Sequence, residues 1–177
     1  VVAFDLAGAE YNYPAKKHRD AFYTVINRNM ATTIHAGEAY GPESIHQALH
    51  YCRANRIGHG TRLHEDPDLM TYVRDFRIPL EICLTSNVQT GAVAYLEDHP
   101  LRHYYDEDLV VTLNTDSRLI SDTTLADEYW KAHRHLGFGP RELVRVARNG
   151  FEASFLHWEE KKKALERFDE RAEELLE

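Results

Sequence analysis

The feature that most constrains the fold of this chain is the alternation of short apolar runs with segments of helical periodicity. The apolar runs start near residues 1, 31, 57, 78 and 109, so the gaps between them are 30, 26, 21 and 31 residues. Gaps of this length match the strand–helix unit of a parallel sheet. A complete (β/α)8 barrel has eight such units, and this sequence shows five. We therefore expect an α/β fold that forms part of a TIM-type barrel.

Both kinds of element can be placed on the sequence. The expected strands are Val1–Leu6, Ala31–Ile34, Arg56–Gly58, Pro79–Leu84 and Leu109–Leu113. Apolar residues at helical spacing, with proline at the first helical position of several segments, predict the helices. These helices are Lys17–Asn29, one opening at Pro42, one opening at Pro67, Thr123–Leu136, Pro140–Phe155 and Glu159–Glu177. A loop-rich stretch at 90–108 is expected to hold a short helix near Leu101–Tyr104.

Length and charge limit the classes of protein that remain. The 177 residues suffice for one domain, which we place at 1–177. A hydrophobic content of 43% is typical of a globular protein. The net charge of −8 argues against nonspecific nucleic-acid binding, which depends on clustered lysine and arginine. It does not argue against a small purine or sugar ligand.

The cysteines and the hydropathy pattern indicate a compartment. Cys52 falls on an apolar helix face and Cys83 inside a strand-like run, so we expect two buried thiols rather than a disulfide. No apolar run approaches the ~20 residues that span a membrane, and no signal peptide is visible. A cytoplasmic protein fits these features best.

The most informative motif is Thr-Ile-His-Ala-Gly-Glu at residues 33–38. It ends an apolar run in a histidine, and ligands bind outside the carboxyl ends of strands in α/β folds. Neutral His35 offers a nitrogen to zinc, and Gly37 lets the chain turn Glu38 into the same cleft. Burial is expected to raise the pKa of Glu38, which suits proton transfer near neutral pH. Taken separately, His35 also fits a surface or core histidine, and Glu38 a helix cap or a salt bridge.

Three other strand ends carry polar groups or glycine. His59 lies between two glycines, where it is placed to steer a metal-activated water or to stabilise negative charge. Asp116 ends the run from residue 110, and a carboxylate is a normal zinc ligand beside histidines. Gly8 follows the first strand, where its backbone N–H can approach a flat ligand. Alone, these residues also fit a loop histidine, an N-cap and a turn glycine.

The order of these motifs is more specific than any one of them. Strand–Gly, strand–His-Ala-Gly-Glu, strand–Gly-His-Gly and strand–Asn-Thr-Asp together resemble the adenosine deaminase family of zinc hydrolases. The resemblance covers essentially the whole chain and corresponds to strands four to eight of the family's barrel, its C-terminal portion. It implies one zinc ion, a purine nucleoside substrate, and hydrolytic loss of ammonia from adenosine or deoxyadenosine. The products are inosine or deoxyinosine, which places the reaction in purine salvage.

The resemblance also implies roles for individual residues. His35 and Asp116 become zinc ligands. Glu38 donates a proton to N1 of the purine as C6 becomes tetrahedral. His59 orients the water at the zinc and assists its deprotonation, and the backbone of Gly8 contacts the N3 edge of the purine.

Two departures from the family pattern open alternatives. The family takes two more zinc ligands from a His-x-His pair on its first strand. Here the only pair with that spacing, His133 and His135, falls on a late helix, where it faces two directions. Ser117 replaces an aspartate that contacts N7 of the purine, although a serine hydroxyl also donates to N7.

Three alternatives follow from these departures. The substrate is another 6-aminopurine, or the chain needs a complementing N-terminal fragment, or it self-associates through open sheet edges. The chain begins with a valine already inside a strand, which leads us to expect that an N-terminal part is missing.

Overall fold

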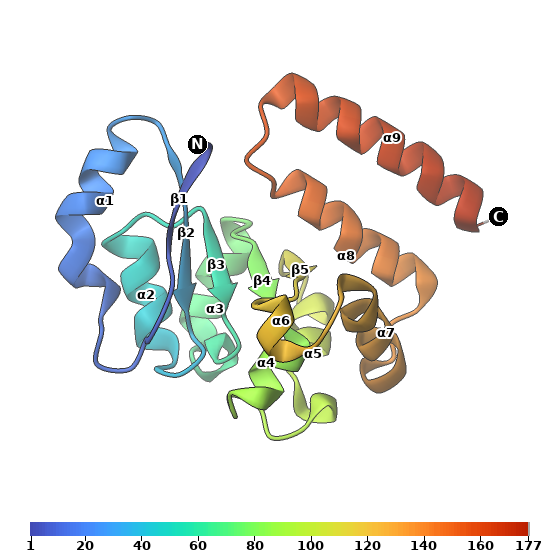
Figure 1. Cartoon of the computed structure of the whole chain (residues 1–177), viewed down its shortest axis with the longest axis horizontal. Coiled ribbons are helices and arrows are strands. Elements are labelled where there is room, and N and C mark those ends of the chain that lie inside the picture. The colour runs from blue at the N-terminus through green and yellow to red at the C-terminus, as the bar shows by residue number, and fades with distance from the viewer. Residues whose placement is uncertain (177) are drawn as a thin grey trace.

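A computed structural model of the protein describes residues 1–176 and contains one parallel sheet (Figure 1). Its strands are β1 (Ala3–Leu6), β2 (Ala31–Ala36), β3 (Arg56–His59), β4 (Leu80–Ile82) and β5 (Val111–Leu113). They are hydrogen-bonded in sequence order, so β1 and β5 form open edges. The α/β class and the sequential parallel order of a partial barrel are confirmed.

Nine α-helices and three 3-10 turns connect and extend these strands within the described residues. The α-helices are α1 (Arg19–Ile26), α2 (Pro42–His50), α3 (Pro67–Asp75), α4 (Leu84–Gln89), α5 (Leu101–Asp106), α6 (Arg118–Ser121), α7 (Leu125–Leu136), α8 (Pro140–Glu152) and α9 (Trp158–Leu176). The 3-10 turns are η1 (Ala15–His18), η2 (Leu63–Glu65) and η3 (Leu96–Asp98). In Figure 1, α1 lies beyond β1 at one end of the molecule, and α9 lies beside α8 at the other.

The two faces of the sheet differ in polarity. Along β2, Thr32, Ile34 and Ala36 are buried, whereas the alternating residues are only partly buried. The buried face continues the apolar core under the helices. On the other face, the Thr33 hydroxyl donates to Glu81 at 2.6 Å, and Arg56 lies 3.1 Å from the same carboxylate. A barrel closed on this face would therefore enclose a charged pair at its centre.

The predicted elements differ from the structure mainly around two short helices. The strand expected at Pro79–Leu84 stops at Ile82, because Leu84 already starts α4. Neither α4 nor α6 was expected. The first helix is shorter than Lys17–Asn29, since residues 15–18 form the separate 3-10 turn η1. The final residue of the last predicted helix, Glu177, lies outside the described residues.

Both thiols are buried and free, as expected. Their placement within elements was wrong, however. Cys83 lies between β4 and α4 rather than inside a strand, and Cys52 lies just after the end of α2. None of the helices in residues 1–176 is both long and apolar enough to cross a membrane.

Candidate active site

His35 and Glu38 are brought together by a tight turn at the carboxyl end of β2. His35 belongs to the strand, and Gly37 adopts a φ of +76°, which favours glycine. A side chain at Gly37 would also collide with Ile45 of α2. The turn places the Glu38 side chain beside that of His35. The distance from Nε2 of His35 to Oε2 of Glu38 is 3.3 Å.

His59 completes this cluster from the neighbouring strand. It ends β3, where it takes an unusual positive φ of 65°. Its ring lies edge-on to that of His35, with centroids 4.4 Å apart. Its Nδ1 is 3.6 Å from Oε1 of Glu38. One potential ligand atom from each of the three residues lies within 4.8 Å of the others. The structure therefore joins three of the predicted site residues.

The pKa of Glu38 moves in the opposite direction to our expectation. Burial does oppose its charge, but the hydrogen bond with His35, the proximity of His59 and donors from Thr90 and Asn87 outweigh it. They lower the pKa of Glu38 to about 2. The prediction of a raised pKa was wrong because it counted desolvation and omitted the hydrogen-bond donors.

The two histidines respond differently to the same surroundings. For His35, burial lowers the pKa, but the hydrogen bond and charge of Glu38 more than compensate, so the net shift is upward. For His59, burial dominates and the pKa falls. The cluster thus favours a charged pair of His35 with Glu38 beside a neutral His59.

Two residues that were not predicted from the sequence hold the Glu38 carboxylate, one in α4 and the other at its C-terminal cap. Asn87 donates from Nδ2 to Oε1 at 2.8 Å, and the Thr90 hydroxyl donates to the same oxygen at 2.9 Å. Both follow the carboxyl end of β4, which is the signal that identified the other site residues. The predicted fourth strand ran to Leu84 instead of Ile82, so its carboxyl end was misplaced and these residues were not recognised.

Glu10 is the second group that was missed. Its carboxylate is buried and accepts hydrogen bonds from the backbone N–H groups of Gly37 at 2.7 Å, Glu38 at 3.0 Å and Ala39 at 2.7 Å. It also accepts from the hydroxyl of Ser44 in α2. Glu10 therefore fixes the turn that carries Glu38. Its position in the loop that follows β1, two residues after Gly8, was the available signal.

Asp116 and Ser117 lie on the far side of the cluster, beyond β5. The Asp116 carboxylate accepts from the Ser86 hydroxyl at 2.7 Å, and Asp116 has a φ of 52°. It lines a cavity of about 220 Å³ together with His35 and His59. Asp116 is not part of the tight three-residue cluster. Ser117 is exposed and lines neither this cavity nor the one beside Gly8.

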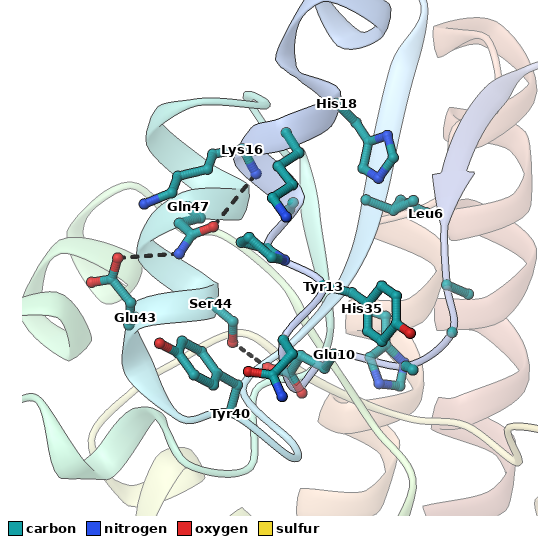
Figure 2. A pocket seen from close by; sticks show the side chains of 17 residues that line it. Leu6, Glu10, Tyr13, Lys16, His18, His35, Tyr40, Glu43, Ser44 and Gln47 are labelled. Atoms are coloured by element: carbon teal, nitrogen blue, oxygen red, sulfur yellow. Dashed lines mark hydrogen bonds between the residues drawn. The ribbon is translucent and has the colours of Figure 1, made fainter.

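Gly8 opens onto a second and larger cavity of about 550 Å³ (Figure 2). Its φ is +127°, and the space where a Cβ would stand is empty. Figure 2 shows Glu10 and Ser44 pointing toward each other on the wall of this cavity, with His35 nearby. His35 lines both cavities. Gly8 is therefore beside the site, with its backbone accessible to a flat ligand.

Known proteins identify the family to which this arrangement belongs. The sequence profile of the adenosine deaminase family matches residues 1–171. The chain belongs to the adenosine deaminase family. It is 45% identical over 172 residues to an adenosine deaminase of Mycobacterium sp. (strain JLS), which covers 91% of this chain and 48% of the relative.

Solved structures agree with the family assignment. An adenine deaminase from Arthrobacter aurescens superposes with a TM-score of 0.93 at 28% identity, covering 98% of this chain and 53% of that one. An Arabidopsis N6-mAMP deaminase superposes with a TM-score of 0.87 at 30% identity, covering 96% and 50%. The chain thus spans about half the length of the relatives that it matches.

In this member of the adenosine deaminase family, the side chains at the site offer atom types that zinc binds. Imidazole nitrogens and a carboxylate are normal zinc ligands, and His35 and Asp116 face one cavity. Further histidine ligands are not supplied by His133 and His135. The first contacts the carbonyl of Phe138 at 2.7 Å and the second contacts Glu97 at 2.7 Å, so they point to different partners.

Proposed function

We propose that the protein contributes the catalytic half of a zinc-dependent deaminase that converts adenosine or deoxyadenosine to inosine or deoxyinosine and ammonia. The observation that carries this proposal is the convergence of His35, Glu38 and His59 at the strand ends of an adenosine deaminase family chain. Residues 1–177 form a single domain in this proposal, the C-terminal part of the barrel, and the protein acts in the cytoplasm in purine salvage.

Each site residue then has a defined task. His35 and Asp116 would hold the zinc ion, which lowers the pKa of a bound water and so supplies a nucleophile at neutral pH. Glu38 delivers a proton to N1 of the purine, and His59 orients the attacking oxygen. The backbone of Gly8 contacts the N3 edge, and the Ser117 hydroxyl donates toward N7.

Proton delivery by Glu38 requires a change from the arrangement described above. A carboxyl group with a pKa of about 2 does not hold a proton near neutral pH. Among the interactions that lower this pKa, the hydrogen bond with His35 is the largest. His35 cannot both donate from Nε2 to Glu38 and ligate a metal through the same atom. Ligation of a metal through Nε2 of His35 would therefore remove the largest of the interactions that lower the pKa of Glu38.

The test is zinc content together with ammonia release from adenosine, measured on the chain combined with the N-terminal half of a relative. It compares the parent with Glu38→Gln, and Glu65→Gln serves as a control because Glu65 pairs with Arg62 away from both cavities. We expect Glu38→Gln to lose at least ~100-fold in kcat, and Glu65→Gln to retain the parent rate. Equal rates for Glu38→Gln and the parent would remove Glu38 from its assigned role.

A related 6-aminopurine is the second candidate substrate. The structural relatives include an adenine deaminase and an N6-mAMP deaminase, and Ser117 departs from the aspartate of the family pattern. A panel of adenosine, deoxyadenosine, adenine, AMP and N6-methyl-AMP, compared by kcat/KM, separates these substrates.

The remaining alternative is that these residues act only after association. β1 and β5 are open edges, and relatives are about twice as long. Sedimentation and metal analysis of the chain, alone and mixed with the N-terminal half of a relative, test this. A zinc-loaded, active monomer would exclude both complementation and self-association.

A further inference from the structure

A chain of buried hydrogen bonds runs from α5 into the site and begins at His99. The ring of His99 is buried, and its Nδ1 accepts the backbone N–H of Leu101 at 3.0 Å. Burial lowers the pKa of His99 to about 3, so the ring is neutral at neutral pH. A neutral imidazole carries one proton. With Nδ1 accepting, that proton is on Nε2.

His99 in turn orients the side-chain amide of Asn87. Nε2 of His99 lies 3.2 Å from Oδ1 of Asn87, so the amide oxygen accepts this N–H. The amide nitrogen then faces the site, 2.8 Å from Oε1 of Glu38. Reversing the amide would set its oxygen against the Glu38 carboxylate and its N–H groups against the His99 N–H. Both contacts therefore select one orientation.

The second hydrogen on the Asn87 amide nitrogen reaches His59. Nδ2 of Asn87 lies 3.0 Å from Nδ1 of His59. An amide nitrogen only donates, so Nδ1 of His59 must accept. In a neutral His59 the ring proton is then on Nε2.

We propose that Asn87, oriented by His99, is a positioning residue that holds neutral His59 in its Nε2–H tautomer while anchoring the Glu38 carboxylate. Because Nδ1 is occupied, His59 presents an N–H donor at its other nitrogen. No residue among 1–176 hydrogen-bonds to that nitrogen, and His59 lines the 220 Å³ cavity. The catalytic consequence rests on the proposed function: His59 holds the attacking oxygen by donating to it from Nε2.

The tautomer can be measured without any activity. Histidine labelled with ¹⁵N in the whole chain gives distinct ring-nitrogen shifts for the two tautomers, and loss of signals in His59→Gln assigns those of His59. At a pH above 8, where neutral rings are observed, we expect the parent to show protonated Nε2 and unprotonated Nδ1. A protonated Nδ1 in the parent would overturn the proposal.

Asn87→Asp reverses the predicted tautomer. Its carboxylate can still accept from His99 but can only accept from His59 as well, so the ring proton should move to Nδ1. A proton shared between this new carboxyl group and Glu38 points toward Glu38, so the same oxygen still has a lone pair that accepts from His59. Asn149→Asp is the matched control, because Asn149 is a buried amide that donates to the Val111 carbonyl far from His59. It should keep the parent tautomer.

Asn87→Leu covers the case in which the acidic variant does not fold, since it removes both donors without adding charge. We expect it to show a mixture of His59 tautomers. Retention of the single parent tautomer in a folded Asn87→Leu or Asn87→Asp would overturn the proposal.

If the deaminase activity is present, Asn87→Leu should lower kcat by roughly 100-fold with little change in KM. An inactive parent would contradict the proposed function. The tautomer measurement would still show whether Asn87 sets the tautomer of His59.

Discussion

The two sides of the site differ in how deeply their functional groups are buried and in how many hydrogen bonds hold them. On the side of β1 to β4, the functional groups are buried and hydrogen-bonded: Glu38 is 8% exposed and His59 is 4% exposed. On the side of β5, Asp116 and Ser117 are exposed. Asp116 has one side-chain partner, Ser86, and the Ser117 side chain makes no capping bond to α6.

This difference distinguishes a part of the site whose side chains are fixed by contacts within the chain from a part whose side chains are not. The position of Glu38 is fixed by the Glu10 carboxylate through the backbone and by Asn87 and Thr90 through the side chain. Within residues 1–176, the Asp116 carboxylate accepts a side-chain hydrogen bond from Ser86 alone. The surroundings of Glu38 are therefore preorganised in this chain, whereas those of Asp116 are open. The following variants test that division by their effect on the free energy of unfolding.

Glu10→Ala should have the largest effect on the preorganised side. It removes the acceptor of three backbone N–H groups in the turn at residues 37–39 and of the Ser44 hydroxyl. Hydrogen bonds to a charged group contribute ~1.5–3 kcal/mol each, and donors left buried add a penalty. We expect a loss of about 3–5 kcal/mol in urea-induced unfolding.

Glu65→Ala is the control for Glu10→Ala, because Glu65 pairs with Arg62 near the surface. Its loss should be below ~1 kcal/mol. Similar losses for the two variants would show that Glu10 does not organise the turn.

The pH dependence of stability should report the buried His99. Its pKa is about 3 in the folded protein and ordinarily about 6.5, so between these values the unfolded chain binds a proton that the folded one does not. Stability is therefore complete above pH 6.5 and falls with decreasing pH. The expected loss between pH 7.5 and 5 is about 2 kcal/mol.

Unfolding of His99→Gln over the same pH range checks this assignment. The slope should become shallower but persist in part, because the pKa of His59 is also lowered by burial. His135→Gln, which changes an exposed histidine on α7, keeps the full decline. An unchanged slope in His99→Gln would refute the role of His99.

The sequence predicted the parts of this site that depend on local geometry. The spacing of apolar runs predicted the parallel sheet, and the turn at Gly37 predicted the meeting of His35 with Glu38. Contacts between distant segments were not predictable in the same way. Glu10 reaches its partners across 27 to 34 positions, and Asn87 reaches Glu38 across 49. No pattern of periodicity encodes such pairs.

The incorrect pKa direction for Glu38 has the same origin. Burial follows from a strand-end position, so desolvation could be anticipated from the sequence. Its effect is reversed by His35 and His59 together with donors from Asn87 and Thr90. The last two lie in and at the end of α4, a helix of six residues whose first residue was predicted to belong to a strand. Short helices next to strands carry too few apolar repeats to show a 3.6-residue period. A site completed by such an element is therefore only partly visible in sequence.

Asp116→Asn tests the open side, where a smaller change in stability is expected. The amide oxygen of asparagine still accepts from the Ser86 hydroxyl, and the side chain is exposed, so the loss should stay below ~1 kcal/mol. Zinc affinity should fall by more than the ~10–100-fold typical of residues that only support a ligand. Equilibrium dialysis measures it. An unaltered zinc affinity would exclude Asp116 as a ligand.

Ser117→Ala should change stability less than Glu10→Ala or Asp116→Asn. Its backbone carbonyl starts α6 by accepting from Ile120 and Ser121, and alanine preserves both bonds. The hydroxyl has no capping partner, so the unfolding free energy should change by less than ~0.5 kcal/mol. If the hydroxyl donates to the purine, KM for adenosine should rise several-fold, as expected for one lost hydrogen bond. A stability loss above 1 kcal/mol with unchanged KM would instead make Ser117 a structural residue. Asp116 would then be the one functional residue assigned to the open side of the site.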